Sequence, residues 1–396
     1  MQKKILFMVI NMNVGGTEKA LLNLIETMPK EKYNIKILML EFSGGFLKSL
    51  PEWVKVEEIK GYEKMKEILH TPPKRIILNF IKNKKFMKAV YYLLIFLIVA
   101  IKNERSLLFA HLLRHQPIEN NEYDVAVAYA GPMDFISYYI TKKVRAKKKY
   151  QWIHFDVSEI GFNVQFATKL YKNFDKIFAV SRDGVNQLIR LVPSIKNKTE
   201  VFTNITIPEN IVKLAKIGGG FQDNFNGIRV LTVGRLSKEK GQDLIIPVLA
   251  HLKYEGFNIR WYCIGDGNAR NEYESMIKEY GIEDEFILMG AKHNPYPFMQ
   301  QCDIYVQPSR HEGYCLTLAE AKCFNLPIIS TKFAGVSEHI THLKTGLITE
   351  TNSTSLHQAV REVIKNSKLK NELISNLKTE NLNEATIIRK KKFSNL

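Results

Sequence analysis

The sequence has few cysteines, and their spacing fits neither a disulfide framework nor a zinc site. The four cysteines include no CxxC pair and have no histidine clustered with them: Cys263, Cys302, Cys315 and Cys323. We therefore expect reduced thiols and a cytoplasmic protein. No strand-to-helix turn reads G-x-G-x-x-G, which argues against a dinucleotide-dependent oxidoreductase.

Long hydrophobic runs are also lacking. The longest, residues 89–101, has 13 residues, whereas a helix needs about 20 apolar residues to span a bilayer. The first residues, MQKKILFMVINMN, have the basic start and apolar run of a signal peptide, but Gly15-Gly16-Thr17-Glu18 follows without a small-residue cleavage site. We interpret this start as a buried first strand.

Acidic residues are fewer than basic ones. The chain has 57 Lys and Arg against 40 Asp and Glu, and its formal net charge is +17. Residues 60–115 hold twelve Lys and Arg against three Glu, and they include the apolar run. Such a segment either lies on an anionic membrane surface or packs into its own domain. The sequence leaves both possibilities open for residues 89–101, and we favour membrane docking for the lysines, at the inner face of the cell membrane.

The rest of the chain alternates strand-like and helix-like segments, which predicts an α/β fold with parallel, doubly wound sheets. Helical spacing marks residues 17–28 and 356–382. We interpret residues 204–220 as an interdomain connection, with a first domain at 1–205, a second at 206–380, and a terminal helix at about 380–396 that packs back on the first domain. The expected strands are residues 5–10, 35–40, 125–129, 150–155, 176–180, 201–203, 229–233, 260–264, 286–289, 304–307 and 327–330.

Two of the expected strands lead into loops suited to phosphate. Gly15 and Gly16 precede a helix, where backbone N–H groups and the helix N-terminus favour an anion. Arg235 and Lys240 share a later loop, where a guanidinium and an ammonium can clamp a diphosphate. The alternatives are an ordinary glycine turn and a solvated charged loop.

Two further strand ends carry titratable groups. His154 and Asp156 lie two residues apart and so on one side of a strand end, where a histidine is most often a structural hydrogen-bonding group. Glu312 and Glu320 bracket a glycine loop that enters an apolar helix, with Glu320 about two turns inside it. A buried glutamate needs a partner, such as the hydroxyls of a ribose. Backbone amides can hold phosphate or sugar oxygens at Gly313, Tyr314, Cys315 and Leu316.

The Glu312–Glu320 spacing, E-x7-E, resembles the signature of retaining glycosyltransferases with the GT-B fold, particularly glycosyltransferase family 4. Five segments stand in that family's order: GGTEKALLNL, VGRLSKEKGQDLII, IGDGNAR, CDIYVQPSRHEGYCLTLAEA and PIISTKFAGVSEHI. They cover most of residues 225–350 and an N-terminal anchor, whereas residues 60–120 match loosely. The resemblance implies two Rossmann-like domains facing a central crevice. The Tyr314-Cys315 pair departs from the family's usual aromatic-glycine pair.

The resemblance also implies a role for each matching residue. Arg235 and Lys240 correspond to the basic pair on the donor diphosphate, Glu320 to the ribose-binding glutamate, and Glu312 to the one that contacts the transferred sugar. Gly16, beside Gly15, corresponds to a glycine whose amide meets the phosphate, and His154 to a histidine near the reacting face of the sugar. Asp266 and Gly267 stand where the nucleobase pocket begins.

The implied reaction is transfer of a hexose-type sugar, with retention, from a nucleoside-diphosphate sugar. We expect UDP rather than GDP, and a glycan or polyprenyl-diphosphate-linked acceptor in bacterial capsule, exopolysaccharide or cell-wall polysaccharide synthesis. The sequence has no D-x-D motif, so we expect neither a metal nor another cofactor.

The sequence favours transfer over three other functions. A GT-B nucleotide-sugar epimerase shares the diphosphate grip, but the E-x7-E block and basic segment favour transfer. A non-catalytic sugar-nucleotide-binding subunit is less favoured because Glu312 and Arg235 are both present. Nucleic-acid binding is not expected, since no zinc-finger, RNP-like or heptad pattern accompanies the charge.

Overall fold

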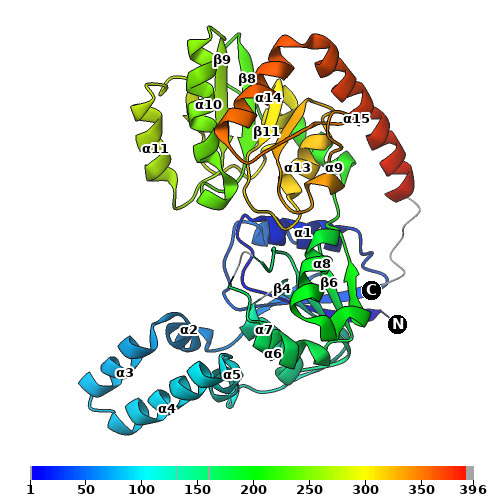
Figure 1. The fold of residues 1–396 in the computed structure, drawn as a ribbon. Coiled ribbons are helices and arrows are strands. Elements are labelled where there is room, and N and C mark those ends of the chain that lie inside the picture. Colours follow the sequence, from blue (N-terminus) through cyan, green and yellow to red (C-terminus); the bar gives the residue numbers. More distant parts are fainter. Residues whose placement is uncertain (1, 132, 159–160, 389–396) are drawn as a thin grey trace. The chain divides into compact units, whose positions relative to one another are not determined.

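The computed structural model describes residues 2–131, 133–158 and 161–388, and it forms two compact units. The first is Met1–Thr203 and the second is Asn204–Leu396. Each unit has a parallel sheet covered by helices (Figure 1). The expected α/β fold with two Rossmann-like domains is confirmed.

The first unit is built on a seven-stranded sheet in the order β3-β2-β1-β4-β5-β6-β7. Every neighbouring pair is parallel, as the apolar runs predicted. Five strands match expected ones, and β7 lies slightly earlier than expected. The edge strand β3 was missed because its sequence, KVEE, has no apolar run. The strands are β1 (Lys3–Val9), β2 (Tyr33–Met39), β3 (Lys55–Glu58), β4 (Glu119–Gly131), β5 (Val144–Ile153), β6 (Lys176–Ala179) and β7 (Thr199–Val201).

The helices of the first unit connect these parallel strands. Apolar residues of the strands and helices form one core that includes Leu6, Phe109 and Phe166. The helices are α1 (Gly16–Glu26), α2 (Tyr62–His70), α3 (Pro73–Lys82), α4 (Phe86–Lys102), α5 (Ser106–Leu113), α6 (Asp134–Lys143), α7 (Val164–Leu170) and α8 (Arg182–Leu191), with short 3-10 turns at Leu47–Ser49, Tyr171–Asn173 and Pro193–Lys198.

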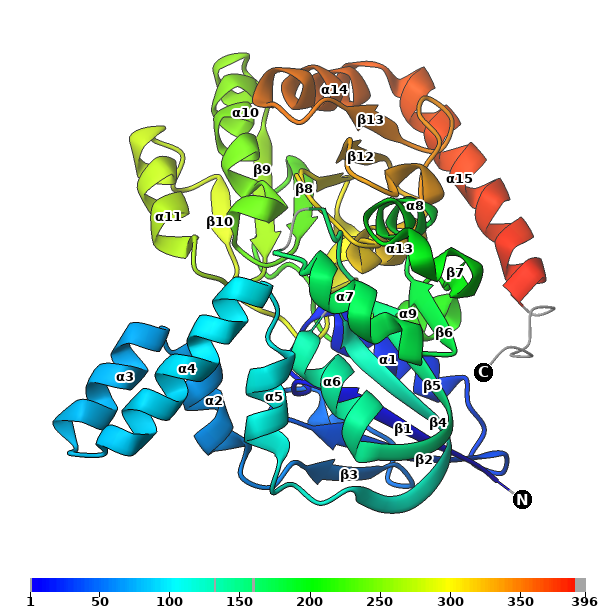
Figure 2. The same cartoon turned by 60° about the horizontal axis from the view of Figure 1, so that its bottom comes forward.

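Helices α3 and α4 form a hairpin that extends from the rest of this unit, as Figures 1 and 2 both show. The apolar run lies in α4, where only a narrow stripe of Ala89, Tyr92 and Ile95 is buried. Much of the remaining helix surface is exposed and apolar, with Met87 and Ile101 at 86% and 82% exposure. Over the described ranges, no helix is long and apolar enough to cross a membrane.

The second unit has a six-stranded parallel sheet in the order β10-β9-β8-β11-β12-β13. Its core includes Trp261, Val306 and Leu356. The strands are β8 (Ile228–Val233), β9 (Ile259–Ile264), β10 (Phe286–Leu288), β11 (Ile304–Gln307), β12 (Ile328–Thr331) and β13 (Leu347–Thr349). The helices are α9 (Pro208–Ala215), α10 (Gln242–Tyr254), α11 (Arg270–Glu279), α12 (Tyr296–Gln301), α13 (Leu316–Lys322), α14 (Ser353–Lys365) and α15 (Ser367–Ile388), with 3-10 turns at Lys238–Lys240 and Val336–Glu338.

The structure changes two expectations for the second unit. Residues 204–220 are not merely a connection, because α9 lies within them and buries Ile211 and Ala215 in the core of this unit. The helical pattern at 356–382 is divided between α14 and α15, which are separated at Asn366. The expected return of residues 380–396 onto the first domain stays a prediction, since residues 389–396 lie outside the described part.

Both sheets reverse their strand order beside the first strand of the unit, between β1 and β4 and between β8 and β11. In doubly wound sheets, ligands bind at the carboxyl ends of the strands on either side of such a switch point. The loops after β1, β4, β8 and β11 are therefore the places to look for a site.

Candidate active site

The loops after β8 and β11 bring together two residues that lie 72 positions apart. The Lys240 ammonium donates to the Glu312 carboxylate at 2.7 Å, and the Ser309 hydroxyl donates to the same carboxylate at 2.7 Å. The Glu312 side chain is only 7% exposed and that of Lys240 21%. Burial by itself lowers the pKa of Lys240, but its interactions with Glu312 and Cys315 together outweigh burial, so the pKa is raised. Lys240 therefore stays cationic at this switch point.

Two features hold the loops after β8 and β11 against each other. Gly241 has a φ of +72°, and a Cβ there would come within 2.0 Å of the Pro308 carbonyl oxygen. Arg310 donates to both carboxylate oxygens of Asp243 at 2.7 Å each and to the Lys238 carbonyl oxygen at 2.7 Å. A bidentate pair of this kind fixes both distance and orientation. Arg310 thus positions the loop that carries Lys240.

Glu320 is buried in α13 and accepts a hydrogen bond of 2.8 Å from the Tyr296 hydroxyl of α12. Burial, followed by the Glu320 charge, raises the pKa of Tyr296, so the phenol remains a donor. Because α13 begins at Leu316, Glu320 is its fifth residue and lies little more than one turn inside it, not two turns as expected. The sequence did not identify Tyr296 as a partner of this carboxylate.

The loop before α13 is shaped by an uncommon backbone conformation. Cys315 has a φ of +57° and a ψ of +68°, the left-handed region that glycine adopts readily and cysteine does not. The neutral His339 ring donates from Nε2 to the Tyr314 carbonyl oxygen and packs edge-on against the Tyr314 ring at 4.5 Å. His339 therefore holds this loop, a role that no sequence motif indicated.

The left-handed backbone at Cys315 predicts an unusual order of stability. Cys315→Gly and Cys315→Ala remove nearly the same buried side chain, but only glycine relieves a conformation that costs an L-residue roughly 1–2 kcal/mol. We expect Cys315→Gly to be the more stable of the two by about 1 kcal/mol in urea unfolding. Equal stability, or a more stable alanine variant, would contradict this account of the loop.

Arg235 is the more exposed member of the basic pair. Its side chain is 62% exposed and forms an ion pair of 3.3 Å with Glu239. The loop after β9 packs tightly against the loop that carries Arg235, because a Cβ on Gly267 would lie 2.2 Å from the Leu236 carbonyl oxygen. Asp266 accepts from the Gly267 amide at 2.8 Å, so this turn supports the Arg235 loop. The structure gives these two residues a packing role beside the nucleobase role that the resemblance implies.

In the first unit, the loop after β1 presents Gly15 and Gly16. Gly15 is extended, with a φ of −155°, and a Cβ on Gly16 would meet no atom within 4 Å. Neither the backbone conformation nor local packing therefore requires glycine at position 16. Both residues stand at the N-terminus of the 11-residue helix α1.

His154 follows β5 and is 6% exposed. Its ring stacks parallel to Trp152 at 6.1 Å, and neither ring nitrogen has a hydrogen-bond partner among the described residues. Burial lowers its pKa to about 3, so the ring is neutral at ordinary pH. It can orient or bind a hydroxyl, but it cannot supply a proton as an imidazolium. Asp156 instead caps its own turn by accepting from the Ser158 amide and hydroxyl.

The buried histidines predict a specific loss of stability in acid. The pKa of His154 is lowered to about 3 and that of His339 to about 4, chiefly by burial. The unfolded chain therefore binds more protons than the folded chain below pH 6.5, and stability falls as pH falls from there to about pH 4. Each histidine contributes a slope of up to about 1.4 kcal/mol per pH unit.

Urea unfolding at pH 7, 6 and 5 measures this effect. We expect His154→Gln and His339→Gln each to flatten the decline in the unfolding free energy of its own unit, whereas His293→Gln, an exposed control, leaves it unchanged. A decline as steep in both variants as in the wild type would rule out the buried-histidine account.

The expected site residues fall into two groups. The second unit holds Arg235, Lys240, Glu312 and Glu320. The first unit holds Gly15, Gly16 and His154. Gln307 and Ser309 were missed, although polar residues at the end of a buried strand are a readable signal. In the described part of the chain, no cluster of three or more His, Cys, Asp or Glu side chains can hold a metal.

The second unit is similar to a known protein family. Residues 222–380 match the family of glycosyl transferases group 1. The chain is 28% identical over 212 residues to an N-acetylgalactosamine-N,N'-diacetylbacillosaminyl-diphospho-undecaprenol 4-alpha-N-acetylgalactosaminyltransferase of Campylobacter jejuni, covering 53% of this chain and 56% of that protein. It is 23% identical over 362 residues to an uncharacterized glycosyltransferase of Haemophilus influenzae, covering 89% and 87%. The matches span about half the length of the first curated relatives, at 56%, 40% and 54%.

Solved structures share the whole fold. The Anabaena protein HepE, crystallised with UDP and glucose, superimposes with a TM-score of 0.68 at 19% identity, covering 96% of this chain and 94% of that one. Sucrose-phosphate synthase from Thermosynechococcus elongatus gives 0.67 at 12% identity, covering 98% and 99%. These likenesses establish the GT-B fold. Together with the group 1 domain and the named relatives, they support a transferase enzyme.

Proposed function

We propose that this chain is a retaining glycosyltransferase that moves a hexose-type sugar from a nucleoside-diphosphate sugar, with UDP favoured, to a glycan or polyprenyl-diphosphate-linked acceptor. The observation that carries the proposal is the paired Lys240 and Glu312 at the switch point of the second unit. A cation for a diphosphate and a carboxylate for sugar hydroxyls lie side by side there, with the buried Glu320 in the helix that follows.

In the proposed reaction, the bond from the anomeric carbon to the diphosphate oxygen breaks and a bond from that carbon to the acceptor oxygen forms on the same face. Arg235 and Lys240 stabilise the charge that develops on the leaving diphosphate. The diphosphate takes the proton of the acceptor hydroxyl, and the neutral His154 contributes hydrogen bonding only. No step requires a metal ion.

The relatives support the substrate classes. The Anabaena structures contain UDP and UDP-glucose, and the name of the Campylobacter enzyme specifies a diphospho-undecaprenol acceptor. Another relative is named as a putative colanic acid biosynthesis glycosyltransferase of Escherichia coli. These names support a role in bacterial capsule, exopolysaccharide or cell-wall polysaccharide synthesis.

The test is a transfer screen with the full chain. UDP- and GDP-sugars are supplied with glycan acceptors and with farnesyl-diphosphate-linked sugars, and NMR of the product determines its anomeric configuration. We expect the product to keep the donor configuration and activity to persist in EDTA. Inversion, a dependence on Mg²⁺, or epimerisation of the donor without transfer would each overturn the corresponding part of the proposal.

The same proposal places the enzyme on the cytoplasmic face of the membrane through the α3–α4 hairpin. The apolar side chains exposed on α4 are flanked by lysines, Lys88 near its start and Lys102 at its end. Exposed apolar surface beside basic residues is typical of helices that lie in a membrane interface. The exposed apolar residues are Leu78, Ile81, Phe86, Met87, Val90, Tyr91, Leu93, Leu94, Leu97, Ile98 and Ile101. Each basic side chain near an anionic surface adds about 1 kcal/mol of attraction, so the lysines favour anionic lipid over a neutral surface.

Charge reversal on the hairpin should weaken membrane binding. We expect the combined change of Lys82, Lys84, Lys85 and Lys88 to Glu to reduce co-sedimentation with anionic liposomes at least tenfold, because all four side chains are exposed. Transfer to a soluble acceptor should persist. Binding should also fade near 1 M salt, where the Debye length is about 3 Å.

A control with the same change in charge tests the specificity of the effect. It carries Glu in place of four exposed lysines of the second unit: Lys213, Lys216, Lys278 and Lys368. This control should bind anionic liposomes nearly as well as the wild type. Equal binding of the wild type to neutral and anionic liposomes would exclude electrostatic docking.

A further inference from the structure

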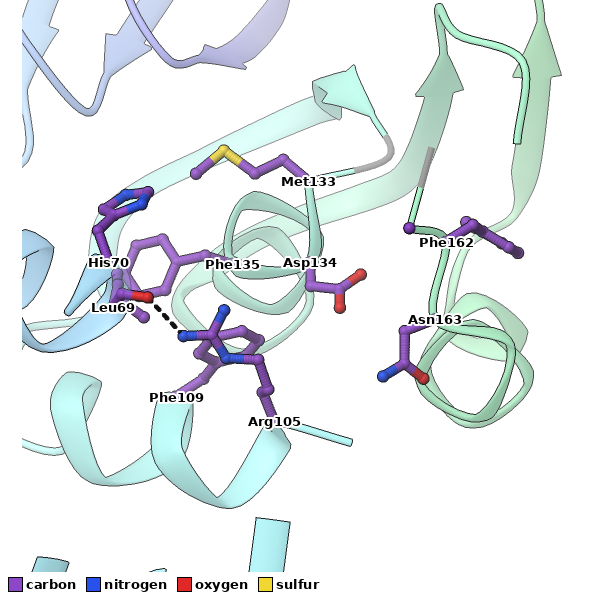
Figure 3. A pocket seen from close by; sticks show the side chains of 10 residues that line it. Leu69, His70, Arg105, Phe109, Met133, Asp134, Phe135, Phe162 and Asn163 are labelled. Carbon is purple, nitrogen blue, oxygen red and sulfur yellow. Dashed lines mark hydrogen bonds between the residues drawn. The ribbon is translucent and has the colours of Figure 1, made fainter. Parts of the chain in front are cut away.

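The first unit contains a cavity of about 340 Å³ at the root of the α3–α4 hairpin. Leu69 and His70 end α2 just before the hairpin, and Arg105 follows it and precedes α5. Asp134 and Phe135 line the cavity from the start of α6, directly after β4, and residues 161–163 close the opposite side (Figure 3). Because β4 is the neighbour of β1 at the switch point of this sheet, the cavity lies where a doubly wound domain binds its ligand.

Arg105 is fixed by the walls of this cavity. Its guanidinium donates from Nη2 to the Leu69 carbonyl oxygen at 2.8 Å and lies over the Phe109 ring at 5.6 Å. Burial lowers its pKa, an effect that the Asp134 charge opposes. One carbonyl oxygen satisfies only part of a guanidinium that has five N–H donors, so donors remain for a ligand.

Asp134 supplies the complementary group. Its carboxylate makes neither a hydrogen bond nor an ion pair with the described residues around it, and Figure 3 shows it pointing into the cavity. Burial raises its pKa to about 7, while the Arg105 charge acts in the opposite direction. A half-buried carboxylate gains much from hydroxyl donors, because an unpartnered buried polar group is costly.

The lining favours a neutral, polyhydroxylated ligand. The Asp134 carboxylate would repel a phosphate, and the Arg105 guanidinium would repel an amine. A sugar ring offers hydroxyls that donate to the carboxylate and accept from the guanidinium. The volume lies within the range of about 300–1,000 Å³ that is typical of small-molecule sites.

We propose that this cavity binds a sugar ring of the acceptor, with Asp134 and Arg105 as its hydrogen-bonding pair. The inference rests on the proposed glycosyltransferase function and specifies where the acceptor is recognised. The cavity joins the root of the hairpin, so a sugar carried on a membrane-bound lipid and a sugar at the end of a soluble glycan are both possible sources of this chemistry. A free anion does not fit this lining, because the Asp134 carboxylate would repel it.

Binding can be measured without any transfer. Saturation-transfer NMR on the full chain uses methyl glucoside, methyl galactoside and methyl N-acetylglucosaminide, with no nucleotide present. We expect at least one glycoside to bind, and Asp134→Asn and Arg105→Gln to weaken it at least tenfold. Asp284→Asn and Arg145→Gln, which change exposed residues of the same types, should leave binding unchanged.

Kinetics on the same variants separate this inference from the proposed function. Asp134→Asn should raise the acceptor KM at least tenfold and leave the acceptor-free hydrolysis of the donor unchanged, both with methyl glycosides and with a farnesyl-diphosphate-linked sugar. A loss restricted to the lipid-linked acceptor would assign the cavity to the diphosphate or the prenyl chain and overturn the sugar assignment. Tighter binding of inorganic pyrophosphate to Asp134→Asn than to the wild type would also overturn the sugar assignment.

The remaining outcomes are also decisive. If the wild type transfers no sugar but a glycoside binds and depends on Asp134, the proposed function fails and the cavity assignment stands. If transfer proceeds with an unchanged acceptor KM in both Asp134→Asn and Arg105→Gln, the cavity assignment fails and the proposed function stands. Circular dichroism confirms that each variant is folded before either comparison is made.

Discussion

Changing Arg235 to Ala is expected to reduce transfer at least 100-fold while leaving the protein folded. The Arg235 side chain is 62% exposed and pairs only with the surface Glu239 among the groups described around it. An exposed pair of this kind contributes little to stability. Loss of a donor aimed at developing charge, in contrast, lowers kcat by about 10²–10³. Initial rates and thermal unfolding of the same preparation measure both quantities.

Glu320→Gln should produce a loss of similar size for a different reason. The amide oxygen has two lone pairs, and Tyr296 donates to one of them, so the amide can accept only one ribose hydroxyl where the carboxylate can accept two. Tyr296→Phe is the matched control, because it removes the Tyr296 hydrogen bond and keeps the carboxylate. We expect the control to keep at least a tenth of the wild-type rate. Turnover near the wild-type value in Arg235→Ala or Glu320→Gln would show that the site is wrongly assigned.

The sequence predicted most of the fold because parallel strands buried on both faces appear as continuous apolar runs. It missed β3 (KVEE) and β13, whose short edge segments do not stand out from their surroundings. It also joined α14 and α15, since the helical spacing continues across Asn366 while the backbone does not. A local sequence pattern therefore identifies a strand or helix only where many of its side chains are buried.

The candidate site was predicted in parts. Residues in strand-to-helix loops, such as Lys240 and Glu312, were identifiable because their side chains have chemical character. The direct pairing of Lys240 with Glu312 could not be predicted, because it depends on β8 and β11 being neighbours in the sheet and on the Arg310–Asp243 ion pair. The cavity at Asp134 was missed entirely, since its walls come from the end of α2, the starts of α5 and α6 and residues 161–163, and no local motif joins these four segments.

The sequence of the apolar run of α4 fits both a core helix and a membrane-contacting helix, and the structure shows why neither alternative alone describes it. One stripe, Ala89, Tyr92 and Ile95, packs on the core of the first unit, while most of the circumference remains exposed. Periodicity could not separate these faces because both are apolar. A helix buried on one face and apolar on the other gives no hydrophobic contrast in the sequence.

Breaking the Lys240–Glu312 pair is expected to have the largest effect on stability. Lys240→Met leaves the Glu312 carboxylate, which is 7% exposed, without its cation. Removing one partner of a buried pair costs about 3–5 kcal/mol, and the partial exposure of Lys240 places this variant near the lower end, at about 3 kcal/mol. Glu312→Gln should cost less, because the Lys240 ammonium, on a side chain 21% exposed, can reach water.

The double variant Lys240→Met/Glu312→Gln separates the stability of the pair from its chemistry. It removes both charges, so we expect it to regain about 2 kcal/mol relative to Lys240→Met in urea unfolding of the second unit. Transfer should nevertheless remain at least 100-fold below the wild type in all three variants, since none restores a cation beside the donor diphosphate and a carboxylate beside its sugar. Additive losses of stability would mean that the two charges are not coupled. Recovered transfer in the double variant would mean that the pair only supports the fold, and the donor site would then have to lie elsewhere.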